Sequence, residues 1–221
     1  IKTAHQLCGS ETDNTFRVNM FVIYSLILYG RGDVAGAREM VKQADDILES
    51  HRIFPGAKAM YIAMKGFLLV EENMLDQAHH FFLENGLHVN KEITYTEEFG
   101  YSSYALLLIL TGKLTEAEML LSNLLTHLQA ANRLERVIET RVILAILHKF
   151  SGNSVKAITC LTDALADAAG DNILMPFLLF QPWISDLLKE VFRLQATTKT
   201  RIPRRVTDKL KQALEKREKA L

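Results

Sequence analysis

Apolar residues recur along the chain in steps of three and four residues, the spacing that places them on one face of an α-helix. Eight such segments follow one another and predict four helical hairpins. The first helices are expected at 12–29, 55–70, 95–110 and 133–150, and the second helices at 33–50, 74–84, 114–130 and 154–169. No alternating apolar and polar run is long enough to predict a strand. The pattern therefore indicates an all-α protein.

A short motif marks the turn inside each hairpin: a turn residue, any residue, a mostly apolar or small residue, two more residues, and alanine. Its copies begin at Gly32, Asn73, Gly112 and Gly152, at spacings of 41, 39 and 40 residues. Gly and Asn tolerate a positive φ, which ends one helix and lets the chain reverse. The alanine is small enough for two helices to approach closely. The alanines are Ala37, Ala78, Ala117 and Ala157.

A single hairpin of this kind cannot bury its own apolar face, so the hairpins are expected to stack in chain order. The motif is typical of tetratricopeptide repeats, although the period of about 40 exceeds their usual length of about 34. We predict a tetratricopeptide-like right-handed α-solenoid. Its repeat domain is expected over 1–195, with units near 12–50, 55–90, 95–131 and 133–170 and a capping helix over 173–195; a linker and a basic helix follow over 196–221.

Several helix boundaries carry their own signals. Asp33 and Ser154 are predicted N-caps, and Pro55 suits a first helical turn. Pro182 should break the helical pattern near the end of the repeats, because proline removes a backbone hydrogen bond from a helix interior. Trp183 is the only tryptophan and is predicted to plug the end of the stack.

Charge changes the picture only at the C-terminal end. The whole chain has a formal net charge of zero, but residues 199–221 hold nine basic and three acidic residues, so a tail of net +6 follows a body of net −6. Such a tail can contact nucleic acid or simply form a solvated linker helix. The apolar face made by Val206, Leu210 and Leu214 could dock on the solenoid or on a second copy, which leaves self-association possible.

Candidate chemistry is sparse. The neighbouring His79 and His80 point about 100° apart on a helix, so they do not chelate a metal as an i, i+4 pair would. No serine or cysteine lies in a nucleophile motif, and we expect neither an enzyme nor a cofactor. Cys8 and Cys160 make no disulfide framework. The apolar runs are shorter than a membrane span, so a cytoplasmic protein without a membrane segment is expected.

A binding surface is suggested by the first helices of the hairpins. Phe21, Tyr61, Tyr101 and Arg141 recur at the 40-residue period, and Tyr104 lies three residues beyond Tyr101. Equivalent positions form a line along a solenoid, and aromatic residues with arginine make good binding anchors. We therefore name these five residues as candidates for ligand or partner binding. The alternative is that the aromatic side chains pack between repeats.

The last third of the chain carries a family resemblance. It lies in the run 141–147, the turn 151–153, the helix 157–169 rich in alanine and leucine, the segment Met175-Pro176-Phe177 and the capping helix around 184–188. These stretches resemble the end of the tetratricopeptide-like domain in large ATP-dependent LuxR-type transcription activators, the maltose-regulon activator family.

The resemblance implies a signal-sensing domain that binds a small-molecule or protein effector and controls neighbouring modules. The chain begins at Ile1 and contains no phosphate-binding loop, so we expect a fragment of a longer protein. In that reading ATP binds to an upstream module, and DNA binds only to a module that follows this chain. The alternative is a protein-interaction scaffold unrelated to transcription.

Overall fold

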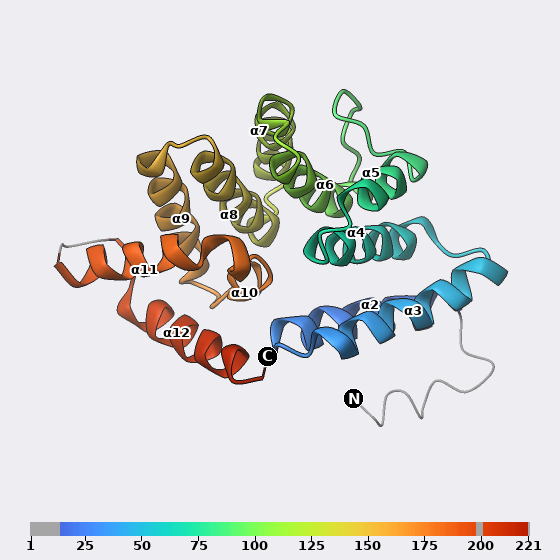
Figure 1. Cartoon of the computed structure of the whole chain (residues 1–221), viewed down its shortest axis with the longest axis horizontal. Helices are drawn as coiled ribbons and strands as arrows, with labels where there is room; N and C mark the ends of the chain where they lie inside the picture. Colours follow the sequence, from blue (N-terminus) through green and yellow to red (C-terminus); the bar gives the residue numbers. More distant parts are fainter. Residues whose placement is uncertain (1–13, 198–200, 221) are drawn as a thin grey trace.

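The computed structural model describes residues 14–197 and 201–220, and every regular element within them is a helix (Figure 1). The first eight helices form four hairpins, each made of two consecutive helices. They are α2 (Asn14–Gly30), α3 (Val34–Ser50), α4 (Pro55–Glu71), α5 (Leu75–Glu84), α6 (Glu98–Leu110), α7 (Leu114–Ala130), α8 (Leu134–Phe150) and α9 (Ser154–Ala168). The hairpins pack in chain order along an arc. The predicted tetratricopeptide-like α-solenoid is confirmed.

Helix boundaries agree with the prediction to within a few residues. The predicted start at Thr12 lies outside the described residues. The helix predicted from 95 begins instead at Glu98, because the preceding residues form a turn in which Thr94 Oγ1 donates to a carboxylate oxygen of Glu97 at 2.8 Å. The N-cap of α9 is Asn153, whose side chain accepts from Lys156 N. Ser154 is the first helical residue, so the predicted Ser154 cap was wrong by one position.

The turns inside the hairpins use the left-handed backbone that the motif predicts. Gly32, Gly112 and Gly152 have φ of 91°, 76° and 73°, and Asn73 has φ of 60°. At the first turn, Gly32 N donates to Tyr29 O and Asp33 N donates to Leu28 O, both at 3.0 Å. These bonds satisfy carbonyl groups that the end of α2 would otherwise leave free.

The motif alanines lie where the two helices of each hairpin meet. All four are fully buried. The second hairpin is packed more closely still, since a Cβ added to Gly66 of α4 would lie 2.2 Å from the ring of Phe82 on α5. Glycine is therefore required for this crossing, and the ring of Phe82 fills the space that a side chain would take.

The C-terminal segment does not continue the stack. It consists of α10 (Met175–Leu179), α11 (Gln181–Thr197) and α12 (Arg204–Glu218). Pro182 lies in the first turn of α11, directly after the break between α10 and α11, as expected for a proline that cannot occupy a helix interior. Helix α11 runs two residues past the predicted domain boundary at 195. Helix α10 lies on the inner side of the arc (Figure 1).

Trp183 does not lie at the end of the stack, where it was predicted. Its ring makes an edge contact with Phe67 of α4, with ring centroids 6.1 Å apart. Phe180 approaches the same Phe67 ring at 5.7 Å. The C-terminal segment thus reaches across the inner side of the solenoid to the second hairpin. Periodicity could not predict this contact, because it joins residues that belong to no repeat.

Helix α12 closes the arc onto its first helix. Val206 and Leu210 are buried, and α12 packs on α9 and α10, so its apolar face docks on the solenoid of the same chain. Near its end, the buried Arg217 donates to Tyr29 O of α2, and its guanidinium lies 4.5 Å from the Tyr29 ring centroid. The end of α12 therefore lies beside α2 (Figure 1).

Candidate ligand cavity on the concave face

A cavity of about 470 Å³ lies on the inner side of the arc. Its walls come from the first helix of every hairpin, α2, α4, α6 and α8, and from α10 with the adjoining Phe180. This volume is within the range of roughly 300–1,000 Å³ that is usual for small-molecule sites. Ile23 and Leu134 line the cavity and are about 41% exposed, so they lie at its mouth.

One side of the cavity is apolar. It is formed by residues of α2, α4 and α10 together with Phe180. They are Val22, Leu26, Met60, Met64, Phe67, Met175, Leu179 and Phe180. Three of these are methionines, whose flexible thioether side chains adapt to ligands of different shape. An apolar wall of this kind binds hydrocarbon surface by removing it from water.

The other side carries a buried ion pair. Arg136 and Glu139 lie one turn apart on α8, each is only 9% exposed, and both line the cavity. Arg136 Nη1 donates to Glu139. Its Nη2 donates to Glu98 O at 2.9 Å and to Ser102 Oγ at 3.0 Å. These bonds hold the guanidinium 4.7 Å from the Phe99 ring centroid.

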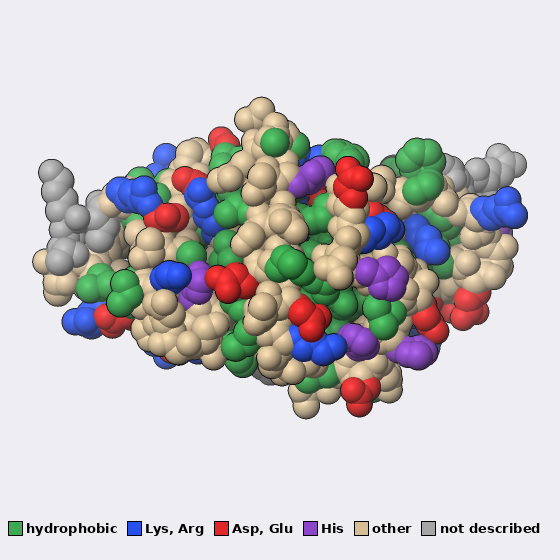
Figure 2. Space-filling model, turned by 90° about the horizontal axis from the view of Figure 1, so that it is seen from above, with side chains coloured by type: hydrophobic (Ala, Val, Ile, Leu, Met, Phe, Trp, Pro, Cys, Tyr) green, Lys and Arg blue, Asp and Glu red, His purple; other side chains and the backbone are tan. Residues whose placement is uncertain are grey.

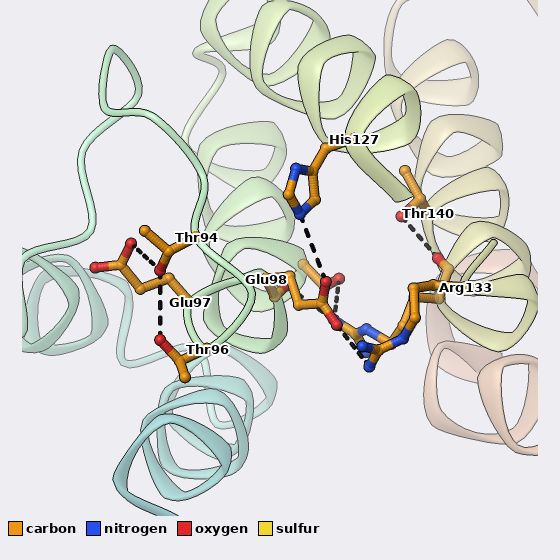
Figure 3. Close-up of polar contacts among 9 residues, drawn as sticks. Thr94, Thr96, Glu97, Glu98, His127, Arg133 and Thr140 are labelled. Carbon is orange, nitrogen blue, oxygen red and sulfur yellow. Dashed lines mark hydrogen bonds and ion pairs between the residues drawn. The ribbon is translucent and has the colours of Figure 1, made fainter. Parts of the chain in front are cut away.

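A second charged cluster adjoins this wall through Arg133, which also lines the cavity (Figure 3). The fully buried carboxylate of Glu98 is 2.7 Å from Arg133 Nη2 and 3.8 Å from His127 Nε2. Neither Glu98 oxygen makes a well-directed hydrogen bond, so the contact with Arg133 is mainly ionic. Arg133 also lies 4.6 Å from the Tyr95 ring centroid. Its positive charge thereby offsets the carboxylate buried at the start of α6.

The aromatic candidate residues do not line this cavity. Phe21, Tyr61, Tyr101 and Tyr104 are between 0 and 8% exposed. Tyr104 packs on Phe82 with centroids 5.4 Å apart. The packing alternative thus describes the contacts of these four side chains, and a direct role in binding stays a prediction.

The polar groups of the other candidates have partners within the chain. Tyr61 donates to Asp45 and makes an edge contact with Phe81. Tyr101 donates weakly to His88 O at 3.4 Å. Arg141 does not line the cavity and pairs with Asp167 of α9.

Some cavity residues lie on the opposite side of the same helices. Ile23, Ala63 and Ser103 line the cavity, each two residues beyond Phe21, Tyr61 and Tyr101 respectively. Two residues turn an α-helix by about 200°, so the predicted line and the observed line face away from each other. The sequence contained a signal for the cavity side of these helices. Ala63 and Ser103 are small residues in apolar helices, and the charged Arg136 and Glu139 lie one helical turn apart in α8.

The outer surface carries charges of both signs. Basic and acidic side chains are interspersed over the face shown in Figure 2, and histidines gather toward its α5 end. Within residues 14–197 and 201–220, no group of three or more His, Cys, Asp and Glu side chains could hold a metal ion. None of the helices in those residues combines the length and the hydropathy that a membrane span needs. Burial raises the pKa of the half-buried Cys160 thiol, which makes it less reactive.

Comparison with known proteins agrees with the architecture. No curated protein matches the chain significantly. A family model described as the MalT-like TPR region matches residues 2–193, which cover all four hairpins, α10 and most of α11. The match thus extends the resemblance seen in the last third of the sequence over nearly the whole repeat domain. The chain belongs to the family of MalT-like TPR regions.

Proposed function

We propose that this chain is the signal-sensing domain of a LuxR-type transcription regulator and that a small-molecule effector binds in the concave cavity. The observation that carries the proposal is the composition of the cavity wall. One bound molecule would contact the first helices of all four hairpins and also α10. Membership of the MalT-like TPR family supports a regulatory role. In this proposal ATP and DNA bind to neighbouring modules.

Helix α10 links the cavity to the end of the chain. Met175 lines the cavity, and it packs so closely on α2 that a Cβ added to Gly30 would lie 2.9 Å from its sulfur. The same helix contacts α12, which closes onto Tyr29 through Arg217. An effector that prefers one position of α10 would therefore change the balance between closed and open arrangements of α12. A following module would sense this change through its attachment to α12.

The cavity assignment is tested by filling the cavity. Ala63 lines it, so Ala63→Phe should place a ring inside it. We expect a thermal-shift screen of sugars, metabolites and signalling molecules to give compounds that stabilise the wild-type chain by mass action and do not stabilise this variant. Ala35→Phe, on the exposed surface of α3, is the matched control and should respond as wild type. Equal stabilisation of all three proteins would reject the concave cavity as the site.

The coupling is tested by hydrogen exchange with and without a compound from that screen. We expect amide exchange to change in α10 and α12 as well as in the first helices of the hairpins. If only the hairpins are protected and α12 exchanges at an unchanged rate, the proposed transmission to the following module is wrong.

A further inference from the structure

We propose that the cavity takes an uncharged amphipathic molecule, with an apolar body against α2, α4 and α10 and a head group that both donates and accepts hydrogen bonds. An amide, or a hydroxyl beside a carbonyl, is the chemistry that fits. This inference rests on the proposed function and specifies the ligand class of the same site. It follows from three features of the wall, namely its apolar side, its free hydrogen-bonding groups and its balanced charge.

The apolar side requires a ligand with a substantial hydrocarbon part. Between Val22 of α2 and Leu179 of α10, the wall offers only aliphatic, methionine and aromatic surface. A fully polar molecule would lose hydrogen bonds to water there without replacing them, which is unfavourable. A hydrocarbon body would gain from burial on that side.

The charged side offers a donor and an acceptor next to each other. A guanidinium has five N–H groups, and three donate in Arg136, to Glu139, Glu98 O and Ser102 Oγ. The N–H of Nε is enclosed by the protein and has no partner in the described part of the chain, and one N–H of Nη1 also makes no hydrogen bond there, so the Nη1 group is the donor left for a bound molecule. Within the described residues, one oxygen of Glu139 also makes no hydrogen bond. A head group that accepts a hydrogen bond from Arg136 and donates one to Glu139 would supply the hydrogen bond that each side chain lacks.

The balance of charge excludes an ionic head group. In the buried part of the wall, Arg136 is already neutralised by Glu139, and Arg133 is paired with Glu98. The other lining carboxylate, Glu135, is exposed to solvent. A carboxylate ligand would have to approach Arg136 against the repulsion of Glu139, and an ammonium ligand would meet the guanidinium. In a site this buried, an extra unpaired charge costs much more than a neutral dipole. The wall therefore selects a neutral polar head.

The test uses three probes with one chain length: octanamide, octanoate and octylammonium. Calorimetric titration of the wild-type chain should show saturable binding of octanamide, with both charged probes at least about tenfold weaker because their charge stays unpaired. Ala63→Phe should abolish octanamide binding, and Ala35→Phe should leave it unchanged. Circular dichroism of each unliganded variant checks that the fold is retained.

A charge variant tests the role of Glu139 directly. Glu139→Gln keeps a hydrogen-bond acceptor for Arg136 and removes the negative charge, so Arg136 is left unneutralised. The preference should then move from octanamide toward octanoate. An unchanged preference in the folded variant would overturn the assignment of the head group to this pair.

The outcomes separate the ligand class from the proposed function. Octanoate or octylammonium binding the wild-type chain as tightly as octanamide overturns the neutral class but leaves a cavity that binds small molecules. If none of the three binds while other compounds stabilise the wild type and not Ala63→Phe, the class is again wrong and the function stands. If no compound distinguishes wild type from Ala63→Phe, both are wrong.

Discussion

The repeat stack α2–α9 and the C-terminal segment α10–α12 are held in place by different kinds of contact. In the stack, buried alanines and leucines repeat from hairpin to hairpin, so each unit is fixed mainly by its neighbours. The C-terminal segment packs on the last hairpin, mainly through α11 on α9 and α8, and reaches the first two hairpins through a few contacts, including Phe180 and Trp183 on Phe67, and Arg217 on Tyr29. The stack thus supplies stability, while the C-terminal segment determines whether the concave side is open or enclosed.

This difference suggests a division of roles. A segment with few contacts to the first two hairpins can move away from them without unfolding the stack, as regulatory elements must. It also forms one wall of the cavity. We therefore expect substitutions in the stack to lower the stability of the whole chain, and substitutions in the C-terminal contacts to change the position of α10–α12 first.

The largest effect is expected at the crossing of α4 and α5. Phe82 is fully buried and fills the space above Gly66, so Phe82→Ala removes a large side chain and leaves a cavity. We expect a loss of about 3–5 kcal/mol in the free energy of unfolding, measured by denaturant titration. Phe54→Ala is the control, since Phe54 is 69% exposed. Equal losses would show that the second hairpin is not packed as described.

The next effect is expected at the closure of α12 onto α2. Arg217→Met keeps an apolar stem but removes the bond to Tyr29 O and the contact with the Tyr29 ring. We expect a loss of about 2 kcal/mol, the usual size for a desolvated cation–π contact, with faster amide exchange in α12 and unchanged exchange in α6–α9. Lys216→Met, exposed on the same helix, should leave both quantities unchanged. Faster exchange throughout the stack would contradict the division of roles.

A smaller effect is expected at the start of α9. Asn153→Ala removes the side-chain oxygen that accepts from Lys156 N at 3.1 Å, and should cost about 1 kcal/mol of stability. Ser154→Ala should change it by less than about 0.5 kcal/mol, as for an exposed position without a special role. Thermal unfolding of both variants decides between them. A larger loss for Ser154→Ala would restore Ser154 as the cap.

The smallest effect is expected where Lys149 ties α8 to α11. Its Nζ donates to Trp183 O at 2.9 Å and to Asp186 Oδ1 at 2.7 Å. The pair is partly exposed, so Lys149→Met should cost less than about 1 kcal/mol. The exposed Lys189→Met is the control.

The same pair predicts a pH dependence. Burial acts to raise the pKa of Asp186, but the hydrogen bond and charge of Lys149 outweigh it and hold that pKa below its usual range. The folded chain therefore binds the proton less readily than the unfolded chain. This contribution is complete above the unfolded pKa of about 4 and is lost as the pH falls further. Lys149→Met should make acid unfolding below about pH 4 less steep. If acid unfolding of Lys149→Met is as steep as that of the wild type, the pairing of Lys149 with Asp186 is contradicted.

The sequence predicted most of the fold, whereas none of the five candidate binding residues lines the cavity. The turn motif and its alanines predicted all four hairpins, because each contact within a unit is local and recurs. The position of Trp183 was not predictable in the same way, since its partner Phe67 lies more than a hundred residues earlier in the chain.

The candidate binding residues and the cavity lie apart for a geometric reason. The period identified which helices form the concave face, but not which side of each helix faces inward. A choice between Tyr61 and Ala63 turns the predicted surface through about 200°. Large aromatic residues suggested anchors, but they are buried between helices, whereas the small Ala63 and Ser103 make room for the cavity.

The return of the C-terminal segment to the first hairpin is tested most directly by one distance in solution. Spin labels at the exposed Arg31 and Lys219, with Cys8 and Cys160 replaced by serine, report the separation of α2 and the end of α12 by pulsed electron resonance. A Cβ on Gly32 would lie 2.8 Å from Arg217 O, so a single narrow distribution at short distance is predicted. A broad distribution at long distances would show an open arc and contradict the enclosed cavity.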